Sequence, residues 1–346
     1  MPEVTLPDRR VLALREYGDP KGRPVVCNHG GLVSGQDVSP ADAAAKALNL
    51  RLISPDRPGI GASTPRPGRT TGDWADDVGQ MADALGLDRF GAFGWSLGGQ
   101  YAMALGARLA HRVSTVVVVA GCIPGLHPAA LNPTDRLFMR LSQRPVPVAA
   151  TAFGTIRTVA RLAPGILGDI TQRSLCAADR AALRALPPGA WADWMATAMS
   201  RPSGMVEEYR VLGRPWGFAP ADVQAPTTFW QGARDTLVPM SWAEQLASAT
   251  PGSTLRTVPN DGHFLAYARW HEVLGAFCAS SSTTMSPIEV ASLTLGASSA
   301  WAGATEIIAD SAMPAIARVE FLLEIIQSLL RKRSAIVGRG ASSTGA

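Results

Sequence analysis

Three residues of this chain, Ser96, Asp235 and His263, are of the types that act together in nucleophilic catalysis. A serine hydroxyl is a poor nucleophile unless a base takes its proton, and that base needs an acid to orient it. The serine is the centre of Gly94-Trp95-Ser96-Leu97-Gly98, which fits the G-x-S-x-G pattern of a nucleophile elbow. After such an elbow, an acid and then a histidine are expected along the chain. We therefore predict Ser96 as the nucleophile, His263 as general base and acid, and Asp235 as the orienting acid.

The elbow is expected to join a strand to a helix. Residues 90–93 form a short apolar run before the turn, and residues 100–109 form an apolar helical stretch. A serine on so tight a turn has a strained backbone, and glycines two positions before and after it avoid clashes because they have no Cβ. The N–H groups at the start of the helix would stabilise an anion beside the serine. In this setting the pattern indicates an elbow far more strongly than the letters alone.

The acid and the histidine also follow predicted strands, residues 227–231 and 254–258. Because functional groups gather at the carboxyl ends of parallel strands, both should converge with Ser96. Either residue alone would be better explained as a turn aspartate or a solvated loop histidine, but the three in order favour catalysis. The competing residues, each weaker by its position, are His111, His127, His271, Asp135 and Asp261.

An oxyanion intermediate needs two N–H donors. The elbow should supply the N–H of Leu97. The loop His29-Gly30-Gly31-Leu32 should supply the second, because its glycines let the backbone approach a substrate. We expect Gly31 as this donor, with Leu32 as the alternative, and a structural role for His29.

Strand and helix signals alternate through most of the chain. This alternation predicts an α/β fold, with a mostly parallel central sheet and helices on both faces. The alternation stops over residues 122–220, where prolines and short helical pieces predict a helical lid inserted into the core; ordinary surface helices are the alternative. The α/β core is then expected over residues 1–121 and 221–278. The strands expected in its first part are residues 10–16, 24–28, 50–54, 90–93 and 114–120, with helices over 39–48, 71–85 and 100–109.

The inserted segment is rich in large apolar side chains. Such residues line apolar pockets, but at helical spacing they also simply pack a helix on its neighbours. The candidates for substrate contact are Trp191, Trp194, Met195, Met199 and Trp216.

After residue 278 the composition changes. Residues 279–313 predict a low-complexity linker, and residues 314–346 an amphipathic helix followed by a tail. The apolar stripe of this helix should pack on the body or on a second copy. Attachment to a membrane surface is the weaker alternative, because Glu320 and Glu324 oppose an anionic surface.

Composition excludes several classes of function. The net charge is +4 with scattered arginines, so nucleic-acid binding is not expected. Four widely spaced cysteines without a C-x-x-C motif indicate neither a zinc site nor a disulfide framework, and they fit reduced thiols in a cytoplasmic protein. No metal or organic cofactor is expected. The first ten residues do not fit a secretory signal, and no apolar run is long enough for a membrane-spanning helix.

Residues 10–278 resemble the lidded, esterase-like group of α/β-hydrolase-fold proteins. The pieces that match are His29-Gly30-Gly31, residues 56–63, residues 94–99, residues 232–235 and Gly262-His263. The resemblance implies a serine hydrolase that cleaves a small or medium carboxylic ester through an acyl-enzyme. It also implies that residues 56–63 are scaffold beneath the active site.

Related subfamilies narrow the choice of reaction. Haloalkane dehalogenases and epoxide hydrolases carry an aspartate where this chain has Ser96, which disfavours those reactions. Three alternatives stay open: a C–C bond hydrolase on the same triad, a cofactor-free haloperoxidase or perhydrolase, and a non-catalytic ligand-binding protein on this scaffold.

Overall fold

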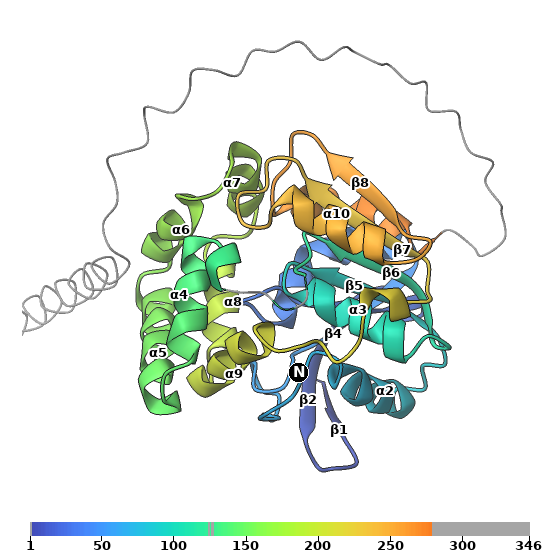
Figure 1. Ribbon diagram of the computed structural model, residues 1–346, viewed down its shortest axis with the longest axis horizontal. Coiled ribbons are helices and arrows are strands. Elements are labelled where there is room, and N and C mark those ends of the chain that lie inside the picture. The colour runs from blue at the N-terminus through green and yellow to red at the C-terminus, as the bar shows by residue number, and fades with distance from the viewer. Residues whose placement is uncertain (1, 124, 126–127, 279–346) are drawn as a thin grey trace, which may run out of the picture. The chain divides into compact units, whose positions relative to one another are not determined.

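The computed structural model describes residues 2–123, 125 and 128–278. Its described strands form one sheet in the order β1-β2-β4-β3-β5-β6-β7-β8 (Figure 1). The first two strands pair antiparallel with their neighbours, and all pairs from β4 to β8 are parallel. The strands are β1 (Glu3–Thr5), β2 (Val11–Gly18), β3 (Arg23–Asn28), β4 (Leu50–Pro55), β5 (Phe90–Trp95), β6 (Val113–Val119), β7 (Thr227–Gly232) and β8 (Thr254–Val258). The predicted α/β class is confirmed; β1 lies outside the predicted strands.

Helices cover both faces of the sheet. In the register of β5 and β6, Phe93 pairs with Val117, so these two side chains point to the same face. On that face Phe93 packs against Trp270, with ring centroids 5.5 Å apart. Val116 and Val118 point the other way and meet α3. The helices of the core are α1 (Asp42–Ala47), α2 (Trp74–Ala84), α3 (Gly98–Arg108), α10 (Met240–Ala249), α11 (Leu265–Ala268) and α12 (Trp270–Gly275).

One predicted core helix is shorter in the structure. Residues 39–48 were expected to be a single helix, but a 3₁₀ helix, η1 (Gly35–Ala41), precedes α1. Pro40 lies inside η1 and cannot donate a backbone hydrogen bond, so the regular α-helix begins after it.

Between β6 and β7 the described chain is helical, and we call its helices α4 to α9 the helical insertion. They are α4 (Pro133–Ser142), α5 (Val146–Leu162), α6 (Pro164–Gln172), α7 (Ala177–Arg184), α8 (Ala190–Ala198) and α9 (Pro202–Leu212), with short 3₁₀ turns η2 (Pro128–Ala130) and η3 (Pro220–Asp222) outside them. Figure 1 shows them gathered beside the sheet. The sequence predicts helical pieces over residues 134–141, 149–162, 177–186 and 191–199, which correspond to α4, α5, α7 and α8, whereas α6 and α9 were not expected. Both begin with proline, which is well tolerated in a first helical turn, so proline there starts a helix rather than interrupting one.

Close backbone contact and buried charge join the insertion to the core. A Cβ on Gly204 of α9 would lie 1.8 Å from the carbonyl oxygen of Gly59, so the two chains touch where neither has a side chain. Glu208, also in α9, is fully buried and pairs with Arg57 and Arg69 of the core. The insertion is therefore packed tightly on the loop of residues 56–63, which was expected to be scaffold.

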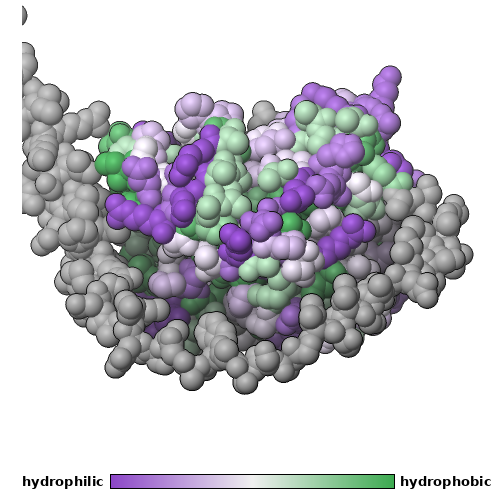
Figure 2. Space-filling view, turned by 90° about the horizontal axis from the view of Figure 1, so that it is seen from above, coloured by the Kyte–Doolittle hydropathy of each residue, from purple (hydrophilic) through white to green (hydrophobic). Residues whose placement is uncertain are grey.

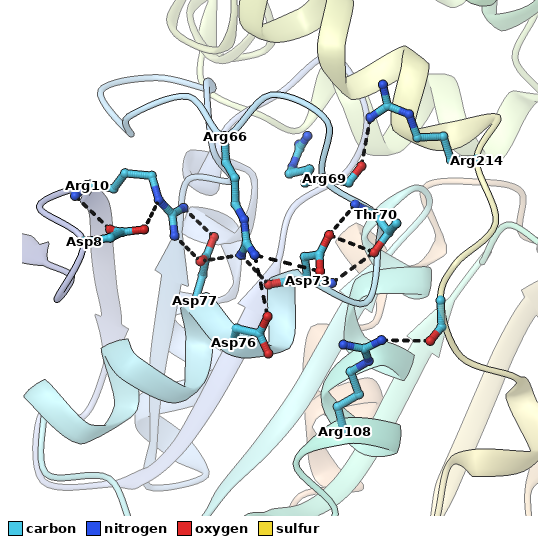
Figure 3. Close-up of polar contacts among 11 residues, drawn as sticks. Asp8, Arg10, Arg66, Arg69, Thr70, Asp73, Asp76, Asp77, Arg108 and Arg214 are labelled. Atoms are coloured by element: carbon cyan, nitrogen blue, oxygen red, sulfur yellow. Dashed lines mark hydrogen bonds and ion pairs between the residues drawn. The ribbon is translucent and has the colours of Figure 1, made fainter.

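A surface network of arginines and aspartates ties the start of β2 to α2 (Figure 3). Arg10 contacts Asp8 and makes two hydrogen bonds to Asp77 of α2, and Arg66 reaches the same Asp77. The shared carboxylate fixes the edge of the sheet against the helix.

The outer surface mixes hydrophobic and hydrophilic residues on the face seen in Figure 2. Among the described residues, the exposed large hydrophobic side chains are Val146, Val148, Leu162 and Ile166. No helix in this described part is long and apolar enough to cross a membrane. The predicted linker over 279–313 and the amphipathic helix over 314–346 lie outside the described residues.

Candidate active site

Ser96 lies on the predicted elbow, between β5 and α3. Its backbone has φ 55°, in the left-handed region that costs energy for a residue with a side chain. The turn is closed because the Ser96 N–H donates to the carbonyl oxygen of Val119 at 2.8 Å, and the Gly99 N–H donates to that of Ser96 at 2.9 Å. Ser96 as a whole residue is partly exposed at the end of β5.

The flanking glycines are required by space. A Cβ on Gly94 would lie 2.3 Å from the carbonyl oxygen of Gly98, and one on Gly98 would lie 2.0 Å from that of Asn28. Both distances are far below van der Waals contact. The glycines of the motif therefore allow β5, α3 and the end of β3 to meet around the serine.

The structure brings the three predicted residues together. Nε2 of His263 lies 2.9 Å from Oγ of Ser96, and Nδ1 of His263 lies 2.9 Å from Oδ2 of Asp235. Each residue follows a different parallel strand: β5, β7 and β8 respectively for serine, aspartate and histidine. The imidazole thus bridges a hydroxyl and a carboxylate, the arrangement that lets it accept a proton from the hydroxyl.

The Asp235 carboxylate is held in place by its own loop. Oδ1 accepts hydrogen bonds from the N–H groups of Leu237 and Val238, at 2.8 and 2.9 Å, and Gln231 donates to Oδ2 at 3.0 Å. Burial alone would raise the pKa of Asp235, but His263 and these N–H groups outweigh it and lower the pKa below its usual value. Asp235 therefore stays ionised beside the imidazole.

His263 is buried, with its side chain only 4% exposed. Burial acts to lower its pKa, but the charge and hydrogen bond of Asp235, and then the charges of Asp179 and Asp135, outweigh burial and raise the pKa above its usual value. The surroundings therefore favour the imidazolium form that a general base acquires during catalysis.

Two residues that the sequence reasoning did not single out fix the histidine loop. The indole N–H of Trp95 donates to the carbonyl oxygen of His263 at 2.9 Å. Asp179, in the first turn of α7, accepts hydrogen bonds from the backbone N–H groups of His263 and Phe264, at 3.0 and 2.8 Å. For Trp95 the available signal is its position in the elbow motif, directly before Ser96. For Asp179 the sequence holds no signal beyond an acid in the first turn of a helix.

The expected oxyanion loop lies against the elbow. A Cβ on Gly31 would lie 3.7 Å from Cβ of Leu97, so these two residues are neighbours. Leu32 has φ 63°, an uncommon backbone conformation for leucine that turns the chain after the glycines. The Gly30 N–H is already used, because it donates to the buried carboxylate of Asp37 at 2.8 Å. Burial raises the pKa of Asp37 to about 7.

His29 has the structural place expected for it. Its Nε2 accepts a hydrogen bond from the Arg57 N–H at 3.2 Å, so Nδ1 carries the proton and donates to the carbonyl oxygen of Gly30 at 2.9 Å. Burial lowers the pKa of His29 well below its usual value, so the ring is neutral. Arg57 also donates to the carbonyl oxygens of His29 and Gly30, which supports the loop from below.

The apolar candidates of the insertion fall into two groups. Trp191 is partly exposed and packs edge-on against Phe264, with ring centroids 5.4 Å apart, and Trp194 packs near Tyr267 at 6.3 Å. Met195 follows in the same helix and is buried. Met199 and Trp216 have almost no exposed surface, and Trp216 packs against Phe218 with ring centroids 5.3 Å apart. For Met199 and Trp216, packing is therefore the better explanation.

The competing histidines and acids have other partners or positions. Asp261 pairs with Arg269, and Asp135 accepts a hydrogen bond from the Tyr209 hydroxyl. His111 and His271 are exposed, and His127 lies outside the described residues. In the part of the chain that the structure describes, no group of three or more His, Cys, Asp or Glu could hold a metal ion. All four cysteines there are free, and Cys27 and Cys122 are buried.

Comparisons with known proteins agree with the observed fold. The family model of the alpha/beta hydrolase fold matches residues 23–144. A pimeloyl-[acyl-carrier protein] methyl ester esterase of Aromatoleum aromaticum is 29% identical over 227 residues, covering 62% of this chain and 80% of that protein. Haloalkane dehalogenase 2 of Mycobacterium bovis is 29% identical over 224 residues, covering 62% and 73%. The solved structure of a thermophilic esterase from Thermogutta terrifontis superposes with a TM-score of 0.60 at 23% identity, over 80% of this chain and 96% of that one.

The sheet, the elbow and these matches show that the chain has the α/β-hydrolase fold. The relatives support a hydrolase. Their names give different reactions, because one is an esterase and the other a dehalogenase.

Proposed function

We propose that the protein is a serine hydrolase that cleaves a small or medium carboxylic ester through an acyl-enzyme. The observation that carries the proposal is the continuous pair of hydrogen bonds from Ser96 through His263 to Asp235. A buried, ionised Asp235 on Nδ1 leaves Nε2 as the acceptor facing the Ser96 hydroxyl, which is the tautomer that a general base needs.

The chemistry then follows from the geometry. Ser96 Oγ attacks the ester carbonyl carbon while Nε2 of His263 takes the hydroxyl proton. The tetrahedral intermediate collapses, and His263 returns this proton to the leaving alkoxide oxygen, so that an alcohol departs and Ser96 is acylated. Water then attacks the acyl carbon, gives its proton to His263, and the acid leaves as the proton returns to Ser96.

We assign the oxyanion donors to the N–H groups of Leu97 and Gly31, with Leu32 as the alternative to Gly31. Leu97 directly precedes α3, and the start of a helix favours an anion. Gly31 is favoured because it lies against Leu97, whereas the N–H of its neighbour Gly30 is taken by Asp37. Such donors are worth about 3–4 kcal/mol each in a transition state of this kind.

An ester is favoured over an alkyl halide by the nucleophile. One relative is named an esterase and another a dehalogenase at equal identity, so similarity alone does not choose between them. A serine alkylated by a halide would leave a stable ether, whereas a serine acylated by an ester leaves a bond that water and His263 can cleave. Over the site, Trp191, with Trp194 and Met195 behind it in α8, would form an apolar wall, and the helical insertion would act as the lid.

Hydrolysis of p-nitrophenyl esters of graded acyl length tests the proposal. The wild type, Ser96→Ala and His263→Ala should be compared with His271→Ala, which removes an exposed histidine of α12. We expect turnover by the wild type and by His271→Ala, and a loss of at least about 10³-fold in the other two. A folded wild type that cleaves none of these esters would contradict ester hydrolysis and turn attention to C–C or peroxide chemistry.

A further inference from the structure

The start of α7 contacts both loops that carry the polar residues of the site. The Thr236 hydroxyl, directly after Asp235, donates to the carbonyl oxygen of Ser174 at 2.7 Å. Five residues further along the insertion, the Asp179 carboxylate accepts the two N–H groups of the His263 loop. One short segment of the insertion, residues 174–179, therefore hydrogen-bonds to both the Asp235 loop and the His263 loop.

The contact between Asp179 and the His263 loop is buried and tightly packed. Asp179 is 1% exposed, and burial raises the pKa of its carboxyl, although the N–H groups of Phe264 and His263 offset part of this cost. Gly262 makes the approach possible, because a Cβ there would lie 2.2 Å from Oδ2 of Asp179 and 2.6 Å from Sγ of Cys176. Because Gly262 has no side chain, the Asp179 carboxylate of the insertion can lie directly beside the His263 loop.

The charge of this carboxylate also acts on the imidazole. The groups that face His263 are Asp235 at Nδ1, Asp179 at its backbone and, with a weaker effect, Asp135 of α4. Nearby, Asp261 is neutralised by Arg269, and Cys176 is a thiol beside Asp179. Asp179 is therefore the second carboxylate after Asp235 that favours the charged imidazole.

We propose that Asp179 is a positioning residue, which holds the His263 backbone in place and stabilises its imidazolium, so that an intact general base requires the helical insertion to be docked. The proposal rests on the function proposed above. It goes beyond that function because it places a residue of the insertion, remote in sequence from the triad, in control of the base.

The test compares the pH dependence of kcat/KM for the wild type, Asp179→Asn and Asp179→Ala. The matched control is Asp169→Asn, which makes the same change at an exposed aspartate of α6 in the same insertion. In Asp179→Asn the acid limb should move to lower pH by a few tenths of a unit or more, because a favourable negative charge is lost. Its kcat should fall about tenfold or more with KM nearly unchanged, and Asp179→Ala should fall further. Asp169→Asn should match the wild type.

A second measurement keeps the proposal separate from the enzyme activity. NMR titration of the His263 ring, assigned with His263→Ala, should give a lower pKa in Asp179→Asn than in the wild type, even if no ester is cleaved. An unchanged His263 pKa in a folded Asp179→Asn overturns the proposal. A wild type without esterase activity but with the shifted histidine overturns only the proposed function.

Discussion

Glu208 is the residue whose replacement should most reveal how the insertion is held on the core. Its carboxylate accepts a hydrogen bond from Nε of Arg57 at 2.6 Å and another from Arg69, and all three side chains are at most 2% exposed. Arg57 also donates to two backbone carbonyl oxygens, so it keeps partners without Glu208. Among the described residues, Arg69 forms its ion pair with Glu208, and the charge of Glu207 acts on it more weakly. Glu208→Gln keeps the size of the side chain, removes its charge and replaces one accepting carboxylate oxygen by an NH2 group.

Breaking a buried ion pair by removing one partner costs about 3–5 kcal/mol, because the other charge stays buried and unpaired. For a domain of this size each kcal/mol lowers Tm by roughly 2–4 °C, so Glu208→Gln should melt about 6–20 °C below the wild type. Glu207→Gln is the control. Glu207 forms an ion pair with Arg214 that is partly exposed, with 16% of the Glu207 side chain and 32% of the Arg214 side chain accessible. This control should lose about 1 kcal/mol or less.

Thermal and urea unfolding at pH 7 measure the difference. The pKa of Glu208 is lowered, because its two arginines outweigh the burial that would raise it. Its ionised form therefore stabilises the fold above its ordinary pKa, and this contribution is lost as pH falls through the lowered pKa. The gap between wild type and Glu208→Gln should accordingly shrink in acid. Equal melting of Glu208→Gln and Glu207→Gln at pH 7 would refute the reasoning.

Three further predictions concern the site. The raised pKa of His263 predicts that kcat/KM increases with pH through a midpoint above the usual value of about 6.5, and a midpoint well below this value in a pH–rate profile would contradict it. Asp235→Asn should lower kcat about 10³–10⁴-fold, through loss of the orienting charge, while circular dichroism stays native; a loss below tenfold would exclude the assigned role. Gly98→Ala should lower the free energy of unfolding in urea by more than about 3 kcal/mol, because its Cβ would lie 2.0 Å from a backbone oxygen. Gly31→Ala should change this free energy by less than about 1 kcal/mol, because the nearest atom to its Cβ would be 3.7 Å away. Similar unfolding of the two variants would disprove this steric account.

The elbow could be predicted because its requirements are local. A strained Ser96 between two glycines without room for Cβ leaves a pattern that can be found within five residues. Asp235 and His263 each follow a predicted parallel strand, and this position was enough to predict that both lie at the same edge of the sheet as Ser96. The strand-helix alternation of the core was predictable for the same reason, since each element shows its own apolar pattern.

What could not be predicted depends on contacts distant in sequence. Asp179 reaches His263 across 84 positions, and an aspartate in the first turn of α7 resembles any acid that favours a helix start. The apolar residues of the insertion give the same ambiguity. Trp191 and Trp216 have the same side chain, yet one is partly exposed beside Phe264 and the other is buried on Phe218. Sequence composition does not separate these two environments.

Covalent labelling of Ser96 by a fluorophosphonate tests the central claim most directly, because it needs an activated serine and no knowledge of the substrate. Mass spectrometry of the digested wild-type protein should find one adduct, on the peptide that contains Ser96. The adduct should be absent in Ser96→Ala and strongly reduced in His263→Ala, while His271→Ala should label like the wild type. A folded wild-type protein that gives no adduct, or an adduct that persists in Ser96→Ala, would contradict the account of Ser96 as an activated nucleophile.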